Sequence, residues 1–208
     1  METVMISGTT KGLGKELAKL FCENDYNYYG LSKWSDLDIT DYKTINNYID
    51  SIPVSDFPKI LINNAGICIP NTLLEMQTED IFNTFNVNLF ALINLSQKFA
   101  KKSIEYGLKT KIVNIASTAG MGARPGRSLY SASKASVINF SKSIAEELKE
   151  YNIKIYCICP GAFDSDLRHY IEPDDDFENM LKPYEVAKEI FNIIKSEYLD
   201  NQIIYIRR

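Results

Sequence analysis

The amino-terminal segment contains a short apolar run, a glycine-rich turn and a helical pattern in immediate succession. The run is Val4-Met5-Ile6, and the turn is Ser7-Gly8-Thr9-Thr10-Lys11-Gly12-Leu13-Gly14. Glycines in such a turn let the backbone approach a pyrophosphate closely, and the positive end of the following helix stabilises its charge. We therefore predict a dinucleotide phosphate site here, with a plain strand-to-helix turn as the alternative.

A second segment with chemical potential lies between residues 112 and 134. Its apolar run is short enough for a buried strand and ends at Ser117, before a loop rich in glycine and proline. Tyr130 and Lys134 stand four residues apart in a helical pattern, so they share one face of the predicted helix. A phenol has a pKa of about 10, and a neighbouring ammonium group favours the phenolate and lowers that pKa. The Ser117 hydroxyl could hold a carbonyl or alcohol oxygen beside the phenol. The alternative is an amphipathic helix whose tyrosine and lysine merely face outwards.

The residues after the second predicted strand bear on the choice of dinucleotide. Residues 26–31 read as a strand, and Ser32 and Lys33 follow it where an NAD-selective site would carry an acidic side chain. Residues 36–39 predict a very short third strand, and too few residues separate the two strands for a crossover helix. We expect an irregular loop instead, in which Trp34 lies either over an adenine or on the plain surface.

The remaining patterns alternate between strands and helices. We predict helices over 42–52, 78–106, 130–151 and 183–194, and strands over 59–62, 153–159 and 203–206. Small residues follow the strand predicted over 59–62, at Ala65 and Gly66, and they permit close approach of a ligand. Asn88 falls in the middle of the longest predicted helix, where a solvated asparagine is the alternative to a functional one. The polar stretch 166–182 predicts a mobile loop over the site.

Composition limits the class of protein. The chain has 208 residues, 45% of them hydrophobic, which is enough for a single α/β domain spanning 1–208. Its net charge of -4 and lack of a dense basic run argue against nucleic-acid binding. We expect no membrane span and no leader peptide before the first strand. The four cysteines form no Cys-x-x-Cys pair and His169 is the only histidine, so we expect no metal site and a reduced, cytoplasmic protein.

Taken together, these motifs resemble the short-chain dehydrogenase/reductase (SDR) family over nearly the whole chain. The matching pieces are, in order, Ser7-Gly8-x-x-x-Gly12-x-Gly14, Asp38-Ile39, Asn63-Asn64-Ala65-Gly66, Asn88, Ser117, Tyr130-x-x-x-Lys134 and Pro160-Gly161. The resemblance implies an α/β fold in one domain, with a Rossmann-like, doubly wound parallel sheet. It implies seven strands in the order 3-2-1-4-5-6-7, with helices on both faces.

The resemblance also implies roles for individual residues. Tyr130 would be the general acid/base, Lys134 would lower its pKa and bind the nicotinamide ribose, and Ser117 would orient the substrate oxygen. Asn88 would hold a water molecule in a proton relay. The implied cofactor contacts are Gly8, Thr10, Lys11, Gly12, Leu13, Gly14, Ser32, Lys33, Asp38, Ile39, Asn64, Ala65, Gly66, Tyr130, Lys134, Pro160, Gly161, Phe163 and Ser165. Among them, Asp38 and Ile39 would meet the adenine, and Phe163 and Ser165 the carboxamide.

We therefore expect an oxidoreductase that moves hydride between a nicotinamide and a carbonyl or alcohol carbon of a small molecule. Lys11 and Lys33 favour NADP(H) over NAD(H). Two alternatives stay open: a catalytically silent NADP-binding sensor or scaffold, and a lyase or epimerase on the same fold. In the resembling family the helices over 79–106 and 130–151 pair with a two-fold mate, so we expect a homodimer or a tetramer. Candidate apolar contacts are Phe82, Phe90, Phe140 and Ile144.

Overall fold

The centre of the protein is one parallel sheet, seen in a computed structural model that describes residues 1–196, 199 and 201–207. Within those residues the strand order is β2-β1-β3-β4-β5-β6, and every neighbouring pair is parallel. The bounds are β1 Thr3–Ser7, β2 Asn27–Leu31, β3 Ile60–Asn63, β4 Thr110–Ile115, β5 Ile153–Pro160 and β6 Gln202–Ile206. The predicted doubly wound parallel sheet is confirmed.

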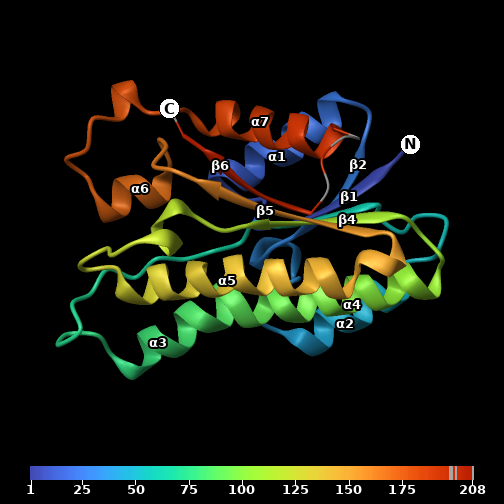
Figure 1. The fold of residues 1–208 in the computed structure, drawn as a ribbon, viewed down its shortest axis with the longest axis horizontal. Helices are drawn as coiled ribbons and strands as arrows, with labels where there is room; N and C mark the ends of the chain where they lie inside the picture. The colour runs from blue at the N-terminus through green and yellow to red at the C-terminus, as the bar shows by residue number, and fades with distance from the viewer. Residues whose placement is uncertain (197–198, 200, 208) are drawn as a thin grey trace.

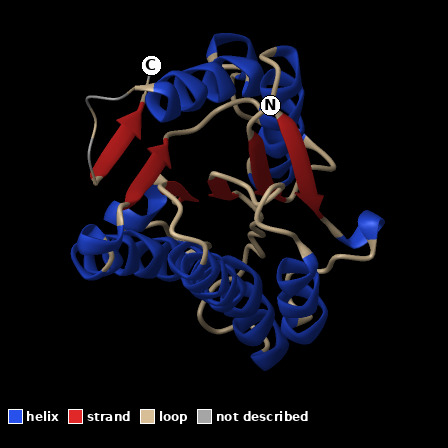
Figure 2. Cartoon of the chain, turned by 90° about the vertical axis from the view of Figure 1, so that its right-hand side faces the viewer, coloured by secondary structure: helices blue, strands red, loops and turns tan. Residues whose placement is uncertain are grey.

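Helices cover both faces of the sheet (Figures 1 and 2). One face carries α1 (Gly12–Glu23) and α7 (Pro183–Lys195), and the other carries α2 (Tyr42–Ser51), α4 (Ala91–Glu105) and α5 (Ser128–Glu147). The short helices α3 (Thr78–Phe85) and α6 (Asp166–Ile171) lie toward the carboxyl ends of the strands (Figure 1). This end of the sheet is therefore enclosed by loops and short helices, and it is where the predicted site residues gather.

Two apolar cores fill the spaces between the three layers. On the α1/α7 side the rings of Phe21 and Phe191 meet edge to face with their centroids 5.0 Å apart. On the opposite side Phe57 and Phe99 pack at 5.3 Å. Strands β1 and β3 are buried along their whole length. A parallel strand covered by helices on both faces needs apolar residues at every position, which explains the continuous runs in the sequence.

The prediction of seven strands is wrong, because residues 36–39 form no strand. Ser32 instead begins a 3-10 turn over Lys33–Ser35, and Asp36 follows in the left-handed conformation with φ 55°. The Leu37 amide donates to the Ser32 carbonyl at 3.1 Å, which closes the turn. Leu37 and Ile39 pack on the core without pairing to β2. The short segment satisfies its polar groups locally, so the described sheet has six strands and β2 is its edge.

The long helix predicted over 78–106 is divided by a π-helical turn at Asn86–Phe90. A π turn inserts one extra residue per turn and is frequent at functional sites. Here the turn contains Asn88, whose side chain is buried. The predicted helix is confirmed in its position, but it consists of two α-helices joined by this π-helical turn.

The polar stretch 166–182 is more ordered than the prediction of a loop. Its first residues form α6, which begins at the capping residue Ser165, and Arg168 pairs with Asp175. Lys182 pairs with Asp164 at 3.0 Å, and Arg127 reaches across to Glu172 at 2.8 Å. The pair of Arg127 and Glu172 ties the segment to the start of α5, and the other two pairs hold the segment together locally. In the ranges that the structure describes, no helix is long and apolar enough to cross a bilayer.

Candidate active site

The predicted site residues meet in one cavity of about 930 Å³ at the carboxyl edge of the sheet. Loops after β1, β2, β3, β4 and β5 build its walls. All the predicted cofactor residues line the cavity, and so does Ser117. Asn88 is the exception, since its side chain lies behind the wall. The cavity is long enough to join the glycine turn at one end to Tyr130 at the other.

The glycine turn brings bare backbone to the cavity. A Cβ atom on Gly14 would lie 2.0 Å from the Gly8 carbonyl oxygen, and one on Gly8 would lie 2.9 Å from the Ala65 Cα. Gly8 also has φ +72°, which a side chain would oppose. α1 begins at Gly12, which lines the cavity, so the positive end of the helix faces the cavity. No acidic residue in the first turn offsets that positive end. Exposed amides and a positive helix end suit the pyrophosphate of a dinucleotide.

Asn64 holds the glycine turn in place from behind. Its side-chain amide donates to the Ser7 and Gly8 carbonyl oxygens at 3.0 and 3.1 Å. In return the Ser7 hydroxyl accepts from the backbone amides of Asn64 and Ala65 at 3.0 and 3.1 Å. Asn64 was predicted as a cofactor contact, and the structure gives its amide this structural task. The sequence did not reveal that Ser7 holds the loop after β3 in the same way. Its signal was a serine at the end of the first strand, directly before the glycines.

The end of β2 holds an ion pair that the sequence did not reveal. Lys33 Nζ lies 3.2 Å from an Asp38 carboxylate oxygen. Thr40 donates to the other oxygen of Asp38 from its amide at 3.0 Å and its hydroxyl at 2.8 Å. Burial acts to raise the pKa of Asp38, but the hydrogen bonds from Thr40 and Lys33 outweigh it and lower the pKa. Asp38 therefore stays ionised and shares Lys33 with any ligand at this end.

Trp34 and Lys11 flank the same end of the cavity. Trp34 lies in the 3-10 turn and is 89% exposed, so its placement over an adenine stays a prediction. Lys11 precedes α1 and is exposed, and among the described residues it has no acidic partner. Of the two lysines predicted to select the dinucleotide, Lys11 is the one with an uncommitted charge.

Ser117, Tyr130 and Lys134 come together at the other end of the cavity. Ser117 follows β4 and accepts from the Ala119 amide at 3.1 Å, which fixes its hydroxyl at the sheet edge. Its hydroxyl lies near the Tyr130 hydroxyl and acts to lower the pKa of that phenol. Lys134, one turn along α5, lies with Nζ 5.8 Å from the Tyr130 ring centre and donates to the Ile115 carbonyl at 2.8 Å. A hydroxyl, a phenol and an ammonium group therefore converge where a reacting oxygen could sit.

Burial dominates the titration of this cluster. It raises the pKa of Tyr130 to about 12, although the nearby Ser117 hydroxyl and the Arg127 charge act in the opposite direction. It lowers the pKa of Lys134 to about 8. Lys134 is not among the groups that lower the pKa of Tyr130, so the expected effect of Lys134 on this phenol is not found. The physical reason is that Lys134 directs its ammonium group to the Ile115 carbonyl and not to the phenol.

Asn88 acts as a clamp through its side chain. Its amide oxygen accepts from the Ile67 amide at 2.8 Å, and its NH₂ group donates to the Ile67 carbonyl at 2.8 Å and to Ser133 at 3.0 Å. Both amide protons are used, so the predicted water is not held by donation from this side chain. The clamp fixes the loop after Gly66 against α5, on which Tyr130 and Lys134 stand.

A buried polar network next to the cluster was also missed. Asn63 and Asn114 stand opposite each other on β3 and β4, and Asn63 donates to the Asn114 side chain at 2.8 Å. Asn63 also donates to Ser96 on α4 at 2.9 Å, and Asn114 donates to Ser141 on α5 at 2.9 Å. The network joins both strands to both helices. Its signal in the sequence was an asparagine inside each of two apolar runs.

Arg127 is a further cavity residue that the sequence reading passed over. It precedes α5, lines the cavity near Tyr130 and pairs with Glu172. Its charge acts to lower the pKa of Tyr130.

The described residues contain no group of three or more His, Cys, Asp or Glu side chains placed to hold a metal ion.

These features define a class: a doubly wound dinucleotide-binding enzyme with a serine, a tyrosine and a lysine at one end of its cleft. The family model described as short chain dehydrogenase matches residues 2–176. The chain therefore belongs to the short-chain dehydrogenase family of oxidoreductases. A nicotinamide dinucleotide is the cofactor that the cavity fits.

Individual relatives agree with this placement. Carbonyl reductase family member 4 of Xenopus laevis is 28% identical, with 97% of this chain and 94% of the relative aligned. A 3-oxoacyl-[acyl-carrier-protein] reductase FabG of Chlamydia muridarum is 30% identical over 80% of this chain and 75% of its own. Two similar solved structures contain nicotinamide cofactors: 4-hydroxyisoleucine dehydrogenase complexed with NADH and ElxO with NADP bound. Their TM-scores are 0.87 and 0.86, their identities 27% and 26%, and each comparison covers 99% of this chain and 96% of the other.

The depressed pKa of Lys134 predicts a stability cost at the active site. The lysine pKa is 10.5 in the unfolded chain and about 8 in the folded protein. The folded state therefore binds fewer protons between these values, and the cost is full at neutral pH and disappears as the pH rises from about 8 to 10.5. After allowing for the lost bond to Ile115, we expect Lys134→Met to raise the free energy of unfolding by about 1–3 kcal/mol at pH 7.

Urea unfolding at pH 7 and at pH 10 measures this effect. The increase in the free energy of unfolding of the Lys134→Met variant should be smaller at the higher pH. Lys142→Met, at an exposed position on the same helix, should change this free energy little at either pH. A Lys134→Met protein that is less stable than the wild type at both pH values would show that the buried ammonium group is not costly.

Proposed function

We propose that the protein is an NADP(H)-dependent oxidoreductase that interconverts a carbonyl and an alcohol in a small molecule. The observation that carries the proposal is that Ser117, Tyr130 and the buried Lys134, one helical turn further along α5, line the same cavity as the glycine turn. This arrangement provides a proton donor and an oxygen-binding group at one end and a phosphate site at the other. A sensor or scaffold would have no need of the buried lysine.

The cofactor, when bound, supplies or accepts the hydride, and the protein residues manage the proton. The Ser117 hydroxyl holds the substrate oxygen, and the Tyr130 hydroxyl delivers a proton to it during reduction. With a pKa of about 12, the phenol is protonated at neutral pH and ready to act as an acid. In the oxidative direction the same residue must first lose its proton, so alcohol oxidation should become faster as the pH rises. Lys134 would hold the nicotinamide ribose.

The substrate class follows from the site and from the names of similar proteins. The cavity provides one oxygen-binding corner and apolar side chains such as Ile69 and Phe163. Similar proteins include a benzil reductase of Bacillus cereus, 28% identical, besides the carbonyl and 3-oxoacyl reductases. We propose reduction of a ketone and use benzil and 3-oxoacyl thioesters as the first probes.

Replacing the phenol tests the proposed function directly. Tyr130→Phe should lower kcat by about 10²–10⁴-fold, because the ring alone cannot transfer a proton. The dissociation constant of NADPH should stay within about twofold, since the ring remains in place. NADPH consumption with the two ketone probes measures the rate, and Tyr151→Phe, at an exposed tyrosine just after the same helix, is the matched control. A Tyr130→Phe enzyme that keeps most of its kcat would remove the proposed acid.

The proposed preference for NADP(H) rests on the charges at the end of β2. Ser32 occupies the position where an NAD site would carry a carboxylate, and its hydroxyl lies 3.2 Å from that of Ser35. Lys11 offers an uncommitted ammonium group. Lys33 must be shared with Asp38, so its contribution is smaller than that of an unpaired lysine. Exposure and salt reduce both contributions further.

We expect Lys11→Ala combined with Lys33→Ala to reduce the ratio of NADH to NADPH dissociation constants by about tenfold. One charge-assisted hydrogen bond of about 1.4 kcal/mol accounts for that factor. Fluorescence titration with each cofactor gives the constants, and Lys15→Ala combined with Lys43→Ala removes two exposed lysines elsewhere as the control. Equal affinities in the wild type would overturn the preference. A preference that survives the double change would assign it to Ser32 and the backbone amides.

We further propose a homodimer, or a tetramer built from it. Phe82 and Phe90 are 66% and 47% exposed on the helical layer beside the site, and Ile81 is 38% exposed. The other two predicted contacts lie elsewhere: Ile144 is buried and Phe140 packs against the core. Light scattering at micromolar concentration should give at least the dimer mass, and Phe82→Asp with Phe90→Asp should lower it. A monomeric mass in the wild type would contradict this proposal.

A cytoplasmic location is the last part of the proposal. All four cysteines are free, and three of them are buried among apolar residues. Free thiols are the usual state in a reducing compartment. Fractionation of the native host would test the location.

A further inference from the structure

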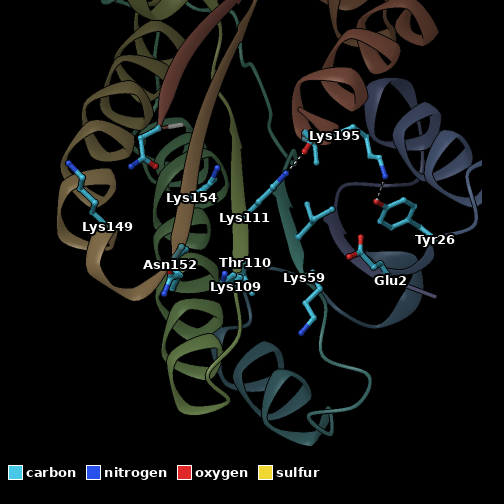
Figure 3. A pocket seen from close by; sticks show the side chains of 14 residues that line it. Glu2, Tyr26, Lys59, Lys109, Thr110, Lys111, Lys149, Asn152, Lys154 and Lys195 are labelled. Carbon is cyan, nitrogen blue, oxygen red and sulfur yellow. Dashed lines mark hydrogen bonds between the residues drawn. The ribbon is translucent and has the colours of Figure 1, made fainter. Parts of the chain in front are cut away.

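A second cavity, of about 800 Å³, opens at the opposite edge of the sheet, where the strands begin (Figure 3). Residues just before or at the start of β1, β3, β4 and β5 line it, together with the end of α7. Its cationic residues are Lys59, Lys109, Lys111, Lys149, Lys154 and Lys195. This edge is remote from the phosphate loop and Tyr130, which stand at the carboxyl ends of the same strands.

Strand register brings these lysines together. Lys111 and Lys154 are directly paired on the neighbouring strands β4 and β5, whose backbones lie about 4.8 Å apart. Lys59 lies just before β3, and its carbonyl accepts from the Lys111 amide at 2.9 Å. Because Ile60 is the register partner of Lys111, the Lys59 side chain leaves the same edge on the opposite face of the sheet. Like charges on adjacent strands repel each other. The lining nevertheless has an excess of positive charge at this edge, although the whole chain has a net charge of -4.

Part of this charge already has structural partners. Lys111 donates to the Ile194 carbonyl at the end of α7, and Lys195 donates to the Tyr26 hydroxyl at 3.1 Å and lies over its ring. Lys154 is engaged as well. These three lysines close the cavity on the side of α7, as Figure 3 shows for Lys111 and Lys195.

The other three lysines have no carboxylate partner among the residues that the structure describes. Lys59 is half-buried at the start of β3, and Lys109 and Lys149 are exposed at the rim. Glu2 is the one described carboxylate in the lining. The described lining thus combines six lysines with one glutamate around a hollow that is large enough for a small ligand.

We infer that this cavity binds a small polyanion that carries two or more phosphate groups. Lysine ammonium groups are compact point charges that suit phosphate oxygens, and several of them around one hollow favour a ligand with several charges. A concave site of this size favours a small molecule over an extended nucleic acid. The inference does not depend on the proposed function, because the two sites lie at opposite edges of the sheet.

Calorimetric titration with inorganic tripolyphosphate tests the inference. The full chain is first saturated with NADPH, so that the phosphate loop is occupied. We expect one binding site per chain, an affinity that falls as salt increases, and weaker binding of citrate at the same ionic strength. Tripolyphosphate should also raise the melting temperature of the NADPH-saturated protein.

The matched variants remove equal charge at different places. Lys59→Gln, Lys109→Gln and Lys149→Gln together should weaken tripolyphosphate binding by about tenfold or more. Lys43→Gln, Lys101→Gln and Lys188→Gln together remove three exposed lysines outside the lining and should change it less than about twofold. Thermal unfolding without ligand confirms that both variants fold. Absence of binding to the wild type, or equal weakening in the two triple variants, would overturn the inference. Citrate binding as tight as tripolyphosphate would overturn the phosphate assignment.

Discussion

Parallel pairing of all the described strands is the constraint on which the rest of the structure depends. It brings the carboxyl ends of β1 to β5 to one edge and their amino ends to the other. Loops that are distant in sequence must therefore meet, as Ser7 meets Asn64 and Asn88 meets Ile67. The same rule that assembles the catalytic cavity at one edge gathers Lys59, Lys111 and Lys154 at the other.

Buried polar groups provide the precision that an apolar core alone would not give the site. The network of Asn63, Asn114, Ser96 and Ser141 fixes β3 and β4 to the helices α4 and α5 that stand behind the site. A buried polar group is costly unless it is hydrogen-bonded, so this network favours one arrangement of the layers. Lys134 is the clearest cost, because an ammonium group is enclosed with a carbonyl as its recorded partner. The site gives up stability to keep a charge beside a phenol.

The sequence predicts those parts of the fold that follow from local patterns. The glycine turn before α1 and the four-residue spacing of Tyr130 and Lys134 are such patterns. Apart from the strand expected over 36–39, each predicted strand and helix lies within a few residues of its predicted range. The absent third strand shows the limit, because four residues at 36–39 are too few for a periodic signal and their turn is closed by Ser32. The π turn around Asn88 depends on a single extra residue in a helix and leaves the apolar period almost unchanged.

Contacts between distant segments could not be predicted in this way. The ion pair of Lys33 and Asp38 depends on a turn whose shape is unknown until Leu37 and Ile39 are packed. The expected lowering of the Tyr130 pKa failed because spacing places Lys134 on the correct face without specifying where its ammonium group donates. The lysine cavity is invisible in the sequence, since its members are separated by long intervals and meet only through strand register.

The central claim is that the cavity at the carboxyl edge of the sheet joins hydride transfer from a nicotinamide to proton delivery by Tyr130. The most direct test is to supply two samples of NADPH, each with deuterium at a different one of the two hydrogen positions on C4 of the nicotinamide. Benzil and a 3-oxoacyl thioester are the separate substrates, and mass spectrometry analyses the products. The account predicts an alcohol with one deuterium on the former carbonyl carbon, formed from one face of the cofactor only. Oxidation of the cofactor without deuterium in the product from either sample, or a product formed without consumption of NADPH, would contradict it.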